Sequence, residues 1–416
     1  MSETTFINAR LCRDGVLIEN EKLVVCTETG KILPGTGCER GNIIDLDGAI
    51  IAPGYIELQT NGVKGFHFTN FEDETQYAEK LDVAARFLAT TGVTGFYPTI
   101  PTVPIPHYHK LLPNLKPRPV PNGATILGAH VEGPYLHPSK KGAHTSSLFQ
   151  PATTAPEEIY GPAYSSTTSS SQKIIKLVTL APELPSSDSL IRSLTAQDKN
   201  IIVSLGHSSA SYTQGLGALS AGATCLTHTL NAMTPLHHRD PGLAGLITLP
   251  PPPPSASSPS SLPQPLRPPY FTLIPDSHHL HPTIVTLLYR SAPQNCILIT
   301  DSIELLGLPD GTYPGNSQID TRQTKLGSKV VKTGSETLIG GCATLDLCVK
   351  NLMQWAGISV AEAVRCVTEN VVGLMGDEMR GRLEVGRRGD LVVLDDGGHV
   401  LQTWIGGRKV WEKEAE

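Results

Sequence analysis

The sequence predicts a (β/α)8 barrel of the TIM type, together with a small β-sandwich domain built from both ends of the chain. Between residues 52 and 380, apolar strand-like runs alternate with longer helical runs, which is the pattern of repeated parallel βαβ units. Residues 1–51 and 381–416 instead hold short β-like runs separated by glycine turns, so we expect the two terminal segments to pair with each other.

The helical runs are identified by apolar residues at helical spacing. Residues 76–92 (QYAEKLDVAARFLATTG) follow this spacing and end at the stop signal Gly92, and residues 344–357 and 359–376 show the same pattern. A Ser/Pro-rich tract at 249–270, after a strand candidate at 242–249, cannot bury a core. We interpret it as a surface loop inserted into the barrel.

The composition excludes several classes of protein. The chain has 416 residues, of which 39% are hydrophobic and 17% charged, as in a globular protein, and its net charge of -6 argues against nucleic-acid or anionic-membrane partners. Its start lacks a basic segment followed by an apolar one, and no apolar run is long enough to span a membrane, so we expect a cytoplasmic protein. Eight scattered cysteines without a CxxC pair indicate neither a disulfide framework nor a thiolate zinc site.

Polar residues capable of metal binding or proton transfer follow several strand candidates. They are Glu132, His207, His228, Asp276, His278, His279 and Asp301. Parallel barrel strands open on one face at their C-terminal ends, so these side chains should converge there. One glutamate and two histidines match the ligand set of a hydrolytic zinc site that keeps an open position. Taken singly, a histidine at a strand end is usually a core or loop residue, and Glu132 could cap a helix; the combination favours a metal.

Asp301 is assigned a different role from the other strand-end residues. It ends an apolar strand beside the expected cation, so it could take a proton from water and pass it to a leaving nitrogen. The alternatives are a fourth metal ligand or a cap of the segment that follows.

These motifs resemble the N-acetylglucosamine-6-phosphate deacetylase family of the amidohydrolase superfamily. The matching stretches are APGYIELQTNG, HVEGPYLHPSKKGAH, LGHSSA, GATCLTHTLNAMTPLHHRDPGLAG, ITDSIELLGLPDGTY, WAGISVAEAVRCVTENVVGLMG and GRLEVGRRGDLVVLDD. They span nearly the whole chain in the order found in the family. The resemblance implies a homodimeric hydrolase of amino-sugar catabolism that converts N-acetylglucosamine 6-phosphate to glucosamine 6-phosphate and acetate.

The resemblance also implies roles for individual residues in the reaction. Glu132, His207 and His228 would bind the catalytic metal, and Asp301 would act as general base and acid. His144 would orient the sugar or its acetamido carbonyl.

Four further residues would bind the substrate by the same resemblance. Asn231 and Ala232 would meet the sugar phosphate through side-chain and main-chain amides, and Arg239 would clamp it, since guanidinium donors match two phosphate oxygens. His279 resembles a substrate-binding histidine that family members supply across a dimer interface. A serine stands where glycine is common in this motif, which leaves open whether His278 or His279 contributes.

The sequence also bears on the number of metals. Many amidohydrolases carry His-x-His at the end of the first barrel strand to hold a second ion, but residues 59–61 read Gln-Thr-Asn. Neutral amides are poor zinc ligands, so we expect one divalent ion, zinc, although iron, manganese or cobalt would be tolerated.

The sequence argues against two alternative functions. A two-metal amidohydrolase, such as a dihydroorotase-like enzyme or an amino-acid deacylase, would need His-x-His and a bridging lysine, and neither is evident. A non-catalytic sugar-phosphate-binding protein on the same scaffold would have no need of Asp301.

Overall fold

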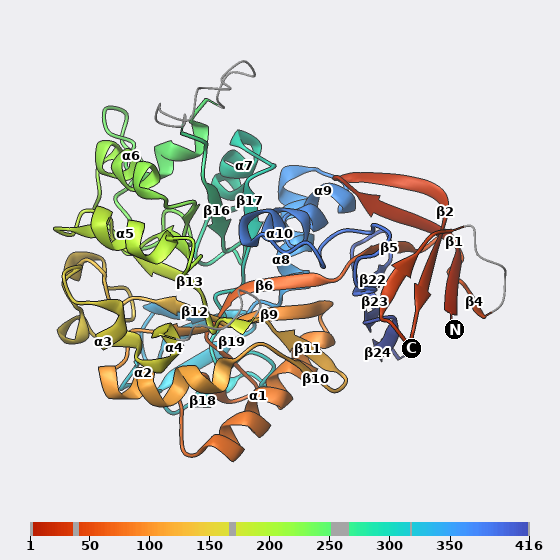
Figure 1. The fold of residues 1–416 in the computed structure, drawn as a ribbon, viewed down its shortest axis with the longest axis horizontal. Helices are drawn as coiled ribbons and strands as arrows, with labels where there is room; N and C mark the ends of the chain where they lie inside the picture. The colour runs from red at the N-terminus through yellow and green to blue at the C-terminus, as the bar shows by residue number, and fades with distance from the viewer. Residues whose placement is uncertain (1–2, 36–40, 166–171, 251–265, 317, 415–416) are drawn as a thin grey trace.

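The computed structural model describes residues 3–35, 41–165, 172–250, 266–316 and 318–414 (Figure 1). Its largest element, here called the main sheet, contains eight strands that are parallel to one another in chain order. They are β6 (Tyr55–Thr60), β9 (Val93–Pro101), β12 (Ala129–Glu132), β13 (Ile175–Leu180), β14 (Ile202–Leu205), β15 (Cys225–Leu226), β16 (Tyr270–Leu273) and β17 (Cys296–Leu298). The hairpin β10 (Arg118–Val120) and β11 (Gly123–Ile126) joins this sheet beside β9.

The main sheet curls until the region of its first strand meets the segment after its last. The backbone N–H of Asp301 donates to the carbonyl of Gln59 at 3.0 Å, and that of Asn61 donates to the carbonyl of Ser302 at 2.7 Å. These bonds bring the C-terminal ends of β6 and β17 together, which places the residues that follow both strands on one face of the molecule.

A buried carboxyl group ties the same two segments. Glu57 Oε1 accepts hydrogen bonds from the backbone N–H groups of Gln59, at 3.1 Å, and Thr300, at 3.3 Å. Burial raises the pKa of Glu57 to about 8. Glu57 is therefore mostly protonated at neutral pH, which avoids an unpaired charge inside the sheet.

Helices lie in the connections between the strands (Figure 1). They are α1 (Glu74–Ala89), α2 (Ile105–Leu111), α3 (Pro156–Tyr160), α4 (Pro162–Ser165), α5 (Ser187–Thr195), α6 (Tyr212–Ala221) and α7 (Pro282–Ser291), followed by α8 (Leu345–Ala356), α9 (Val360–Arg365) and α10 (Glu369–Met375). The helix predicted at 76–92 is confirmed as α1, where the Asp73 side chain caps the N-terminus by accepting from the N–H of Gln76. The run at 344–357 is α8, whereas the run at 359–376 forms two helices, α9 and α10.

The strand expected at 242–249 is wrong, because this segment forms a 3₁₀ helix, Leu243–Thr248. Its apolar residues recur at a spacing of three and pack on α6: a Cβ on Gly215 would lie 2.9 Å from Leu243 and 2.7 Å from Leu246. Packing on one side, rather than in a sheet, explains the apolar run. Most of the Ser/Pro tract that follows, residues 251–265, lies outside the described residues.

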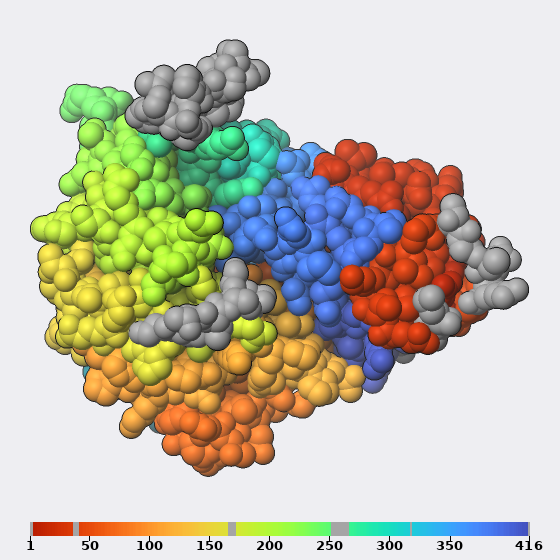
Figure 2. Space-filling view, in the orientation of Figure 1, coloured from red at the N-terminus to blue at the C-terminus, as the bar shows by residue number. Residues whose placement is uncertain are grey.

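The two ends of the chain pair in one sheet, as expected. Its strands are β1 (Glu3–Arg13), β2 (Val16–Cys26), β3 (Lys31–Leu33), β4 (Asn42–Asp45), β5 (Ile50–Pro53), β22 (Leu391–Leu394), β23 (Val400–Ile405) and β24 (Arg408–Glu412). Antiparallel pairing of β5 with β22 joins the N-terminal to the C-terminal part. Phe6 and Trp404, whose ring centroids are 5.0 Å apart, pack in the core of this terminal domain, which forms one end of the molecule (Figure 2).

An antiparallel four-stranded sheet between β17 and α8 was not predicted. It consists of β18 (Gly311–Tyr313), β19 (Gln323–Leu326), β20 (Lys329–Lys332) and β21 (Leu338–Gly341), and we call it the 311–341 insertion. The N–H of Ile303 donates to the carbonyl of Gly341 at 3.1 Å, which fixes β21 close to Asp301.

The structure also bears on two expectations from composition. The seven cysteines among the described residues are free and buried, which agrees with the prediction of no disulfide framework. In the same part of the chain, no helix has both the length and the apolar character that a membrane span requires.

Candidate active site

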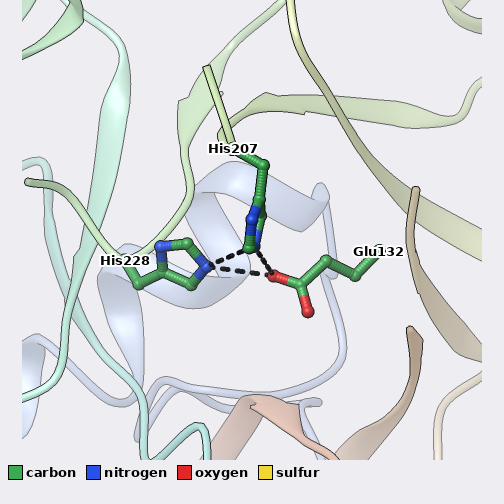
Figure 3. A group of neighbouring side chains, drawn as sticks. All are labelled: Glu132, His207 and His228. Atoms are coloured by element: carbon green, nitrogen blue, oxygen red, sulfur yellow. Dashed lines mark hydrogen bonds and ion pairs between the residues drawn. The ribbon is translucent and has the colours of Figure 1, made fainter. Parts of the chain in front are cut away.

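Glu132, His207 and His228 converge where their strands end (Figure 3). Glu132 is the last residue of β12, and the two histidines follow β14 and β15. Glu132 Oε1 lies 3.3 Å from His207 Nε2 and 3.0 Å from His228 Nε2, and the two ring nitrogens are 3.1 Å apart. All three side chains are buried. The convergence expected from the sequence is therefore present.

The backbone is strained at several residues of this site. His207, His228 and Asp301 have φ values of 48°, 29° and 46°, in a left-handed region that side chains other than glycine rarely adopt. Each such residue costs on the order of 1–3 kcal/mol and is retained where the surrounding fold imposes it, typically at functional sites. Two of the three proposed metal ligands, together with Asp301, thus hold a backbone conformation that is unfavourable for their residue types.

The arrangement of donors and acceptors fits a cation. The Nδ1–H of His207 donates to the carbonyl oxygen of Lys140 at 2.8 Å, so its Nε2 presents a lone pair to Glu132 and His228. A lone pair and a carboxylate oxygen that face each other at this distance repel unless a positive charge lies between them. One carboxylate and two imidazoles are the donor set that a divalent ion such as zinc prefers, and the carbonyl partner of His207 fixes the required tautomer.

His144 is the third imidazole beside Glu132. Its Nδ1 accepts from the backbone N–H of Thr102 at 3.3 Å, so its Nε2–H points toward Glu132 Oε2, 3.6 Å away. Burial lowers the pKa of His144, which keeps the ring neutral. Burial alone would raise the pKa of Glu132, but the neighbouring imidazoles of His144, His207 and His228 hold that pKa well below its usual range.

Two amides connect Glu132 to Asp301. Gln59 Nε2 donates to Glu132 Oε1 at 3.0 Å and to Asp301 Oδ1 at 3.2 Å, and Asn61 Nδ2 donates to Asp301 Oδ1 at 2.7 Å. Burial, and then the charge of Glu132, raise the pKa of Asp301. The two amides that the sequence identified as poor metal ligands therefore hold the carboxylates in place, and Asp301 accepts a proton more readily than an exposed aspartate.

A cavity of about 240 Å³ opens over these groups. Its lining includes eight of the nine residues to which the resemblance assigns a role: Glu132, His144, His207, His228, Asn231, Ala232, His279 and Asp301. Another part of the lining was not predicted from the sequence; it includes Ile303 and, from the 311–341 insertion, Asn316, Gln318, Ile319, Leu338, Ile339 and Gly340. None of these positions carries a residue type that is typical of metal binding or acid–base catalysis, so no sequence motif indicates them.

The structure distinguishes the two histidines that the sequence left open. His279 lines the cavity, and its Nδ1–H donates to Asp276 Oδ2 at 2.7 Å, whereas His278 Nε2 lies 3.1 Å from the Ser328 hydroxyl. The resemblance implies a histidine supplied across a dimer interface, whereas His279 lines the cavity of its own chain, where Asp276, three residues after β16, accepts its Nδ1–H.

Arg239 is the predicted site residue that the structure does not bring to the others. It is exposed on the connection after β15 and does not belong to the lining of the cavity, which this connection reaches through Asn231 and Ala232. Asn231 Nδ2 donates to the carbonyl of His228 at 3.1 Å, so it is held against a proposed metal ligand.

Comparison with known proteins places the chain in a family. It is 36% identical over 99% of its length to the N-acetylglucosamine-6-phosphate deacetylase of Danio rerio, covering 97% of that protein. The chain belongs to the N-acetylglucosamine-6-phosphate deacetylase family. The human deacetylase is 34% identical, over 99% of this chain and 96% of that protein. No family model matches the chain.

The solved deacetylase of Pasteurella multocida shares the fold. It superposes with a TM-score of 0.80 and 26% identity, over 98% of this chain and 99% of that one. Because the match runs along both chains, the curled α/β sheet and the small terminal domain both belong to the architecture of the deacetylase family.

Proposed function

We propose that the protein removes the N-acetyl group of N-acetylglucosamine 6-phosphate, releasing glucosamine 6-phosphate and acetate in amino-sugar catabolism. The observation that carries this proposal is the buried cluster of Glu132, His207 and His228, with Asp301 one amide away, in a chain 36% identical to a deacetylase of this name. A non-catalytic sugar-phosphate-binding protein has no use for an Asp301 whose pKa is raised at this position.

One divalent ion, zinc, is the cofactor of the proposed reaction. Glu132, His207 and His228 would hold it. The side-chain N–H groups of Gln59 and Asn61 instead donate to the carboxylates of Glu132 and Asp301. When bound, the ion supplies Lewis-acid polarisation of the amide carbonyl and acidifies the attacking water.

The chain's own residues then orient the substrate and move the proton. Asp301 takes the proton of the attacking water and delivers it to the departing amine as the C–N bond breaks. The neutral His144 lines the cavity and would support the carbonyl or a ring hydroxyl, and His279, fixed by Asp276, faces the same cavity. Asn231 and Ala232 would bind the phosphate end, with the exposed Arg239 clamping it.

The finer structural assignments are part of the same proposal. The hydrogen bonds between the ends of the main sheet support a closed (β/α)8 barrel over residues 52–380. Residues 1–51 and 381–416, whose strands form one sheet, are proposed to fold as a β-sandwich. We propose a homodimer in which the subunits meet near the sites, because this would bring Arg239, which lies outside the cavity of its own chain, to a bound phosphate. A cytoplasmic location follows from the substrate class.

Acetate release from three substrates tests the proposal. We expect turnover of N-acetylglucosamine 6-phosphate, with kcat/KM lower by about 10- to 100-fold for unphosphorylated N-acetylglucosamine, because hydrogen bonds to a charged group contribute ~1.5–3 kcal/mol. N-acetylgalactosamine 6-phosphate, the 4-epimer, serves as the matched comparison. Zinc-loaded protein that binds the sugar phosphate without releasing acetate would refute the proposal and support the non-catalytic alternative.

A further inference from the structure

Glu304 is a buried carboxylate that the proposed reaction does not use. It lies three residues after Asp301, and only 6% of it is exposed. A charge at this depth is costly unless hydrogen bonds compensate for its lost hydration. The described hydrogen-bond donors to its carboxylate, Asn316 and Gln323, both come from the segment between Pro314 and the start of β19.

Those partners are two side-chain amides. Asn316 Nδ2 donates to both carboxylate oxygens of Glu304, at 3.0 Å to Oε1 and 3.1 Å to Oε2, and Gln323 Nε2 donates to Oε1 at 2.8 Å. Gln323 Nε2 also donates to the carbonyl of Pro314 at 3.1 Å. Glu304 thus joins both ends of the segment that leads from β18 to β19.

Asn316 also holds the turn that begins at this residue. Its Oδ1 accepts from the backbone N–H groups of Gln318, at 2.9 Å, and Ile319, at 3.0 Å. Because Oδ1 is occupied, Asn316 is fixed with its NH₂ group toward Glu304. Asn316, Gln318 and Ile319 all line the cavity that also contains Asp301.

We propose that Glu304 is a positioning residue for substrate: it fixes the turn of Asn316, Gln318 and Ile319 as one wall of the catalytic cavity. The inference rests on the proposed function, since the wall matters only if substrate binds in that cavity. Glu304 acts through Asn316 and not on the reacting atoms, so its loss should weaken substrate binding more than it slows the chemistry.

A swap of the two side chains tests the proposal. Glu304→Gln places an NH₂ group against the NH₂ of Asn316, and Asn316→Asp places a carboxylate against a carboxylate. We expect each single variant to raise KM about 10-fold, as one disrupted hydrogen bond to a charged group would, with kcat changed less than about threefold. The double variant reverses donor and acceptor, so its KM should return to within about threefold of wild type.

Metal content and a matched variant complete the experiment. Zinc per chain should be unchanged in all variants, and Glu336→Gln, which alters an exposed carboxylate of the same insertion paired with Lys329, should leave KM unaltered. If Glu304→Gln fails to fold, the half-buried Asn316→Asp tests the same contact. Unchanged KM in the single variants, or a double variant no better than they are, would overturn the role of Glu304. Absence of turnover by the wild type would instead refute the proposed function.

Discussion

Replacing Asp301 with asparagine is expected to lower kcat by about 10²- to 10⁴-fold, the usual contribution of a positioned acid or base. Asparagine keeps the oxygen that accepts from Gln59 and Asn61, so the local geometry should persist. It cannot take a proton from the attacking water. The rate of acetate release should therefore fall, while the zinc content per chain stays at the wild-type level.

An exposed carboxylate provides the control for this prediction. Asp396 lies in the terminal domain with its side chain 80% exposed, paired to Arg10, and Asp396→Asn should leave kcat unchanged. Deacetylation by Asp301→Asn at close to the wild-type rate would show that the proton is moved by another group. Loss of zinc from this variant would instead identify Asp301 as a metal ligand.

The second large effect is expected for Glu132→Gln, which should release the metal. Glutamine removes the negative charge that faces His207 and His228, and it sets an NH₂ group against the Nε2–H of His144. Residues that only orient metal ligands contribute about 10- to 100-fold in affinity, so loss of a ligand should cost at least about 100-fold. Zinc titration of the metal-free protein measures this directly.

Activity should follow the metal in that variant. Acetate release should fall with zinc occupancy and recover in part at high zinc concentration. Glu157→Gln, at an exposed glutamate on α3, is the matched control and should bind zinc as the wild type does. Wild-type zinc affinity in Glu132→Gln would show that the ion lies elsewhere.

The metal cluster was predictable because it depends on topology more than on fine packing. Each of Glu132, His207 and His228 ends an apolar run, and parallel strands bring such ends to one face whatever the loops do. The pairing of the N-terminal and C-terminal segments was predictable in the same way, because both segments hold short β-like runs. These inferences needed only the order of the strands.

Other parts of the site depend on contacts that leave no periodic signal. The turn at Asn316 lines the cavity because Glu304 holds it, and neither residue belongs to a repeated pattern. His279 enters its own cavity because Asp276 accepts its Nδ1–H, a contact that the spacing of residues does not reveal. The segment at 242–249 looked like a strand because an apolar 3₁₀ helix and a buried strand share composition over a few residues.

The most direct measurement is anomalous diffraction from zinc-loaded crystals at the zinc absorption edge. We expect one strong peak in the cavity, about 2.0–2.2 Å from a carboxylate oxygen of Glu132 and from the Nε2 atoms of His207 and His228. Asp301 should lie beside the ion without being required to hold it. A peak bound by other residues, or no peak in this cavity after loading, would contradict the assignment of these three side chains as the catalytic metal site.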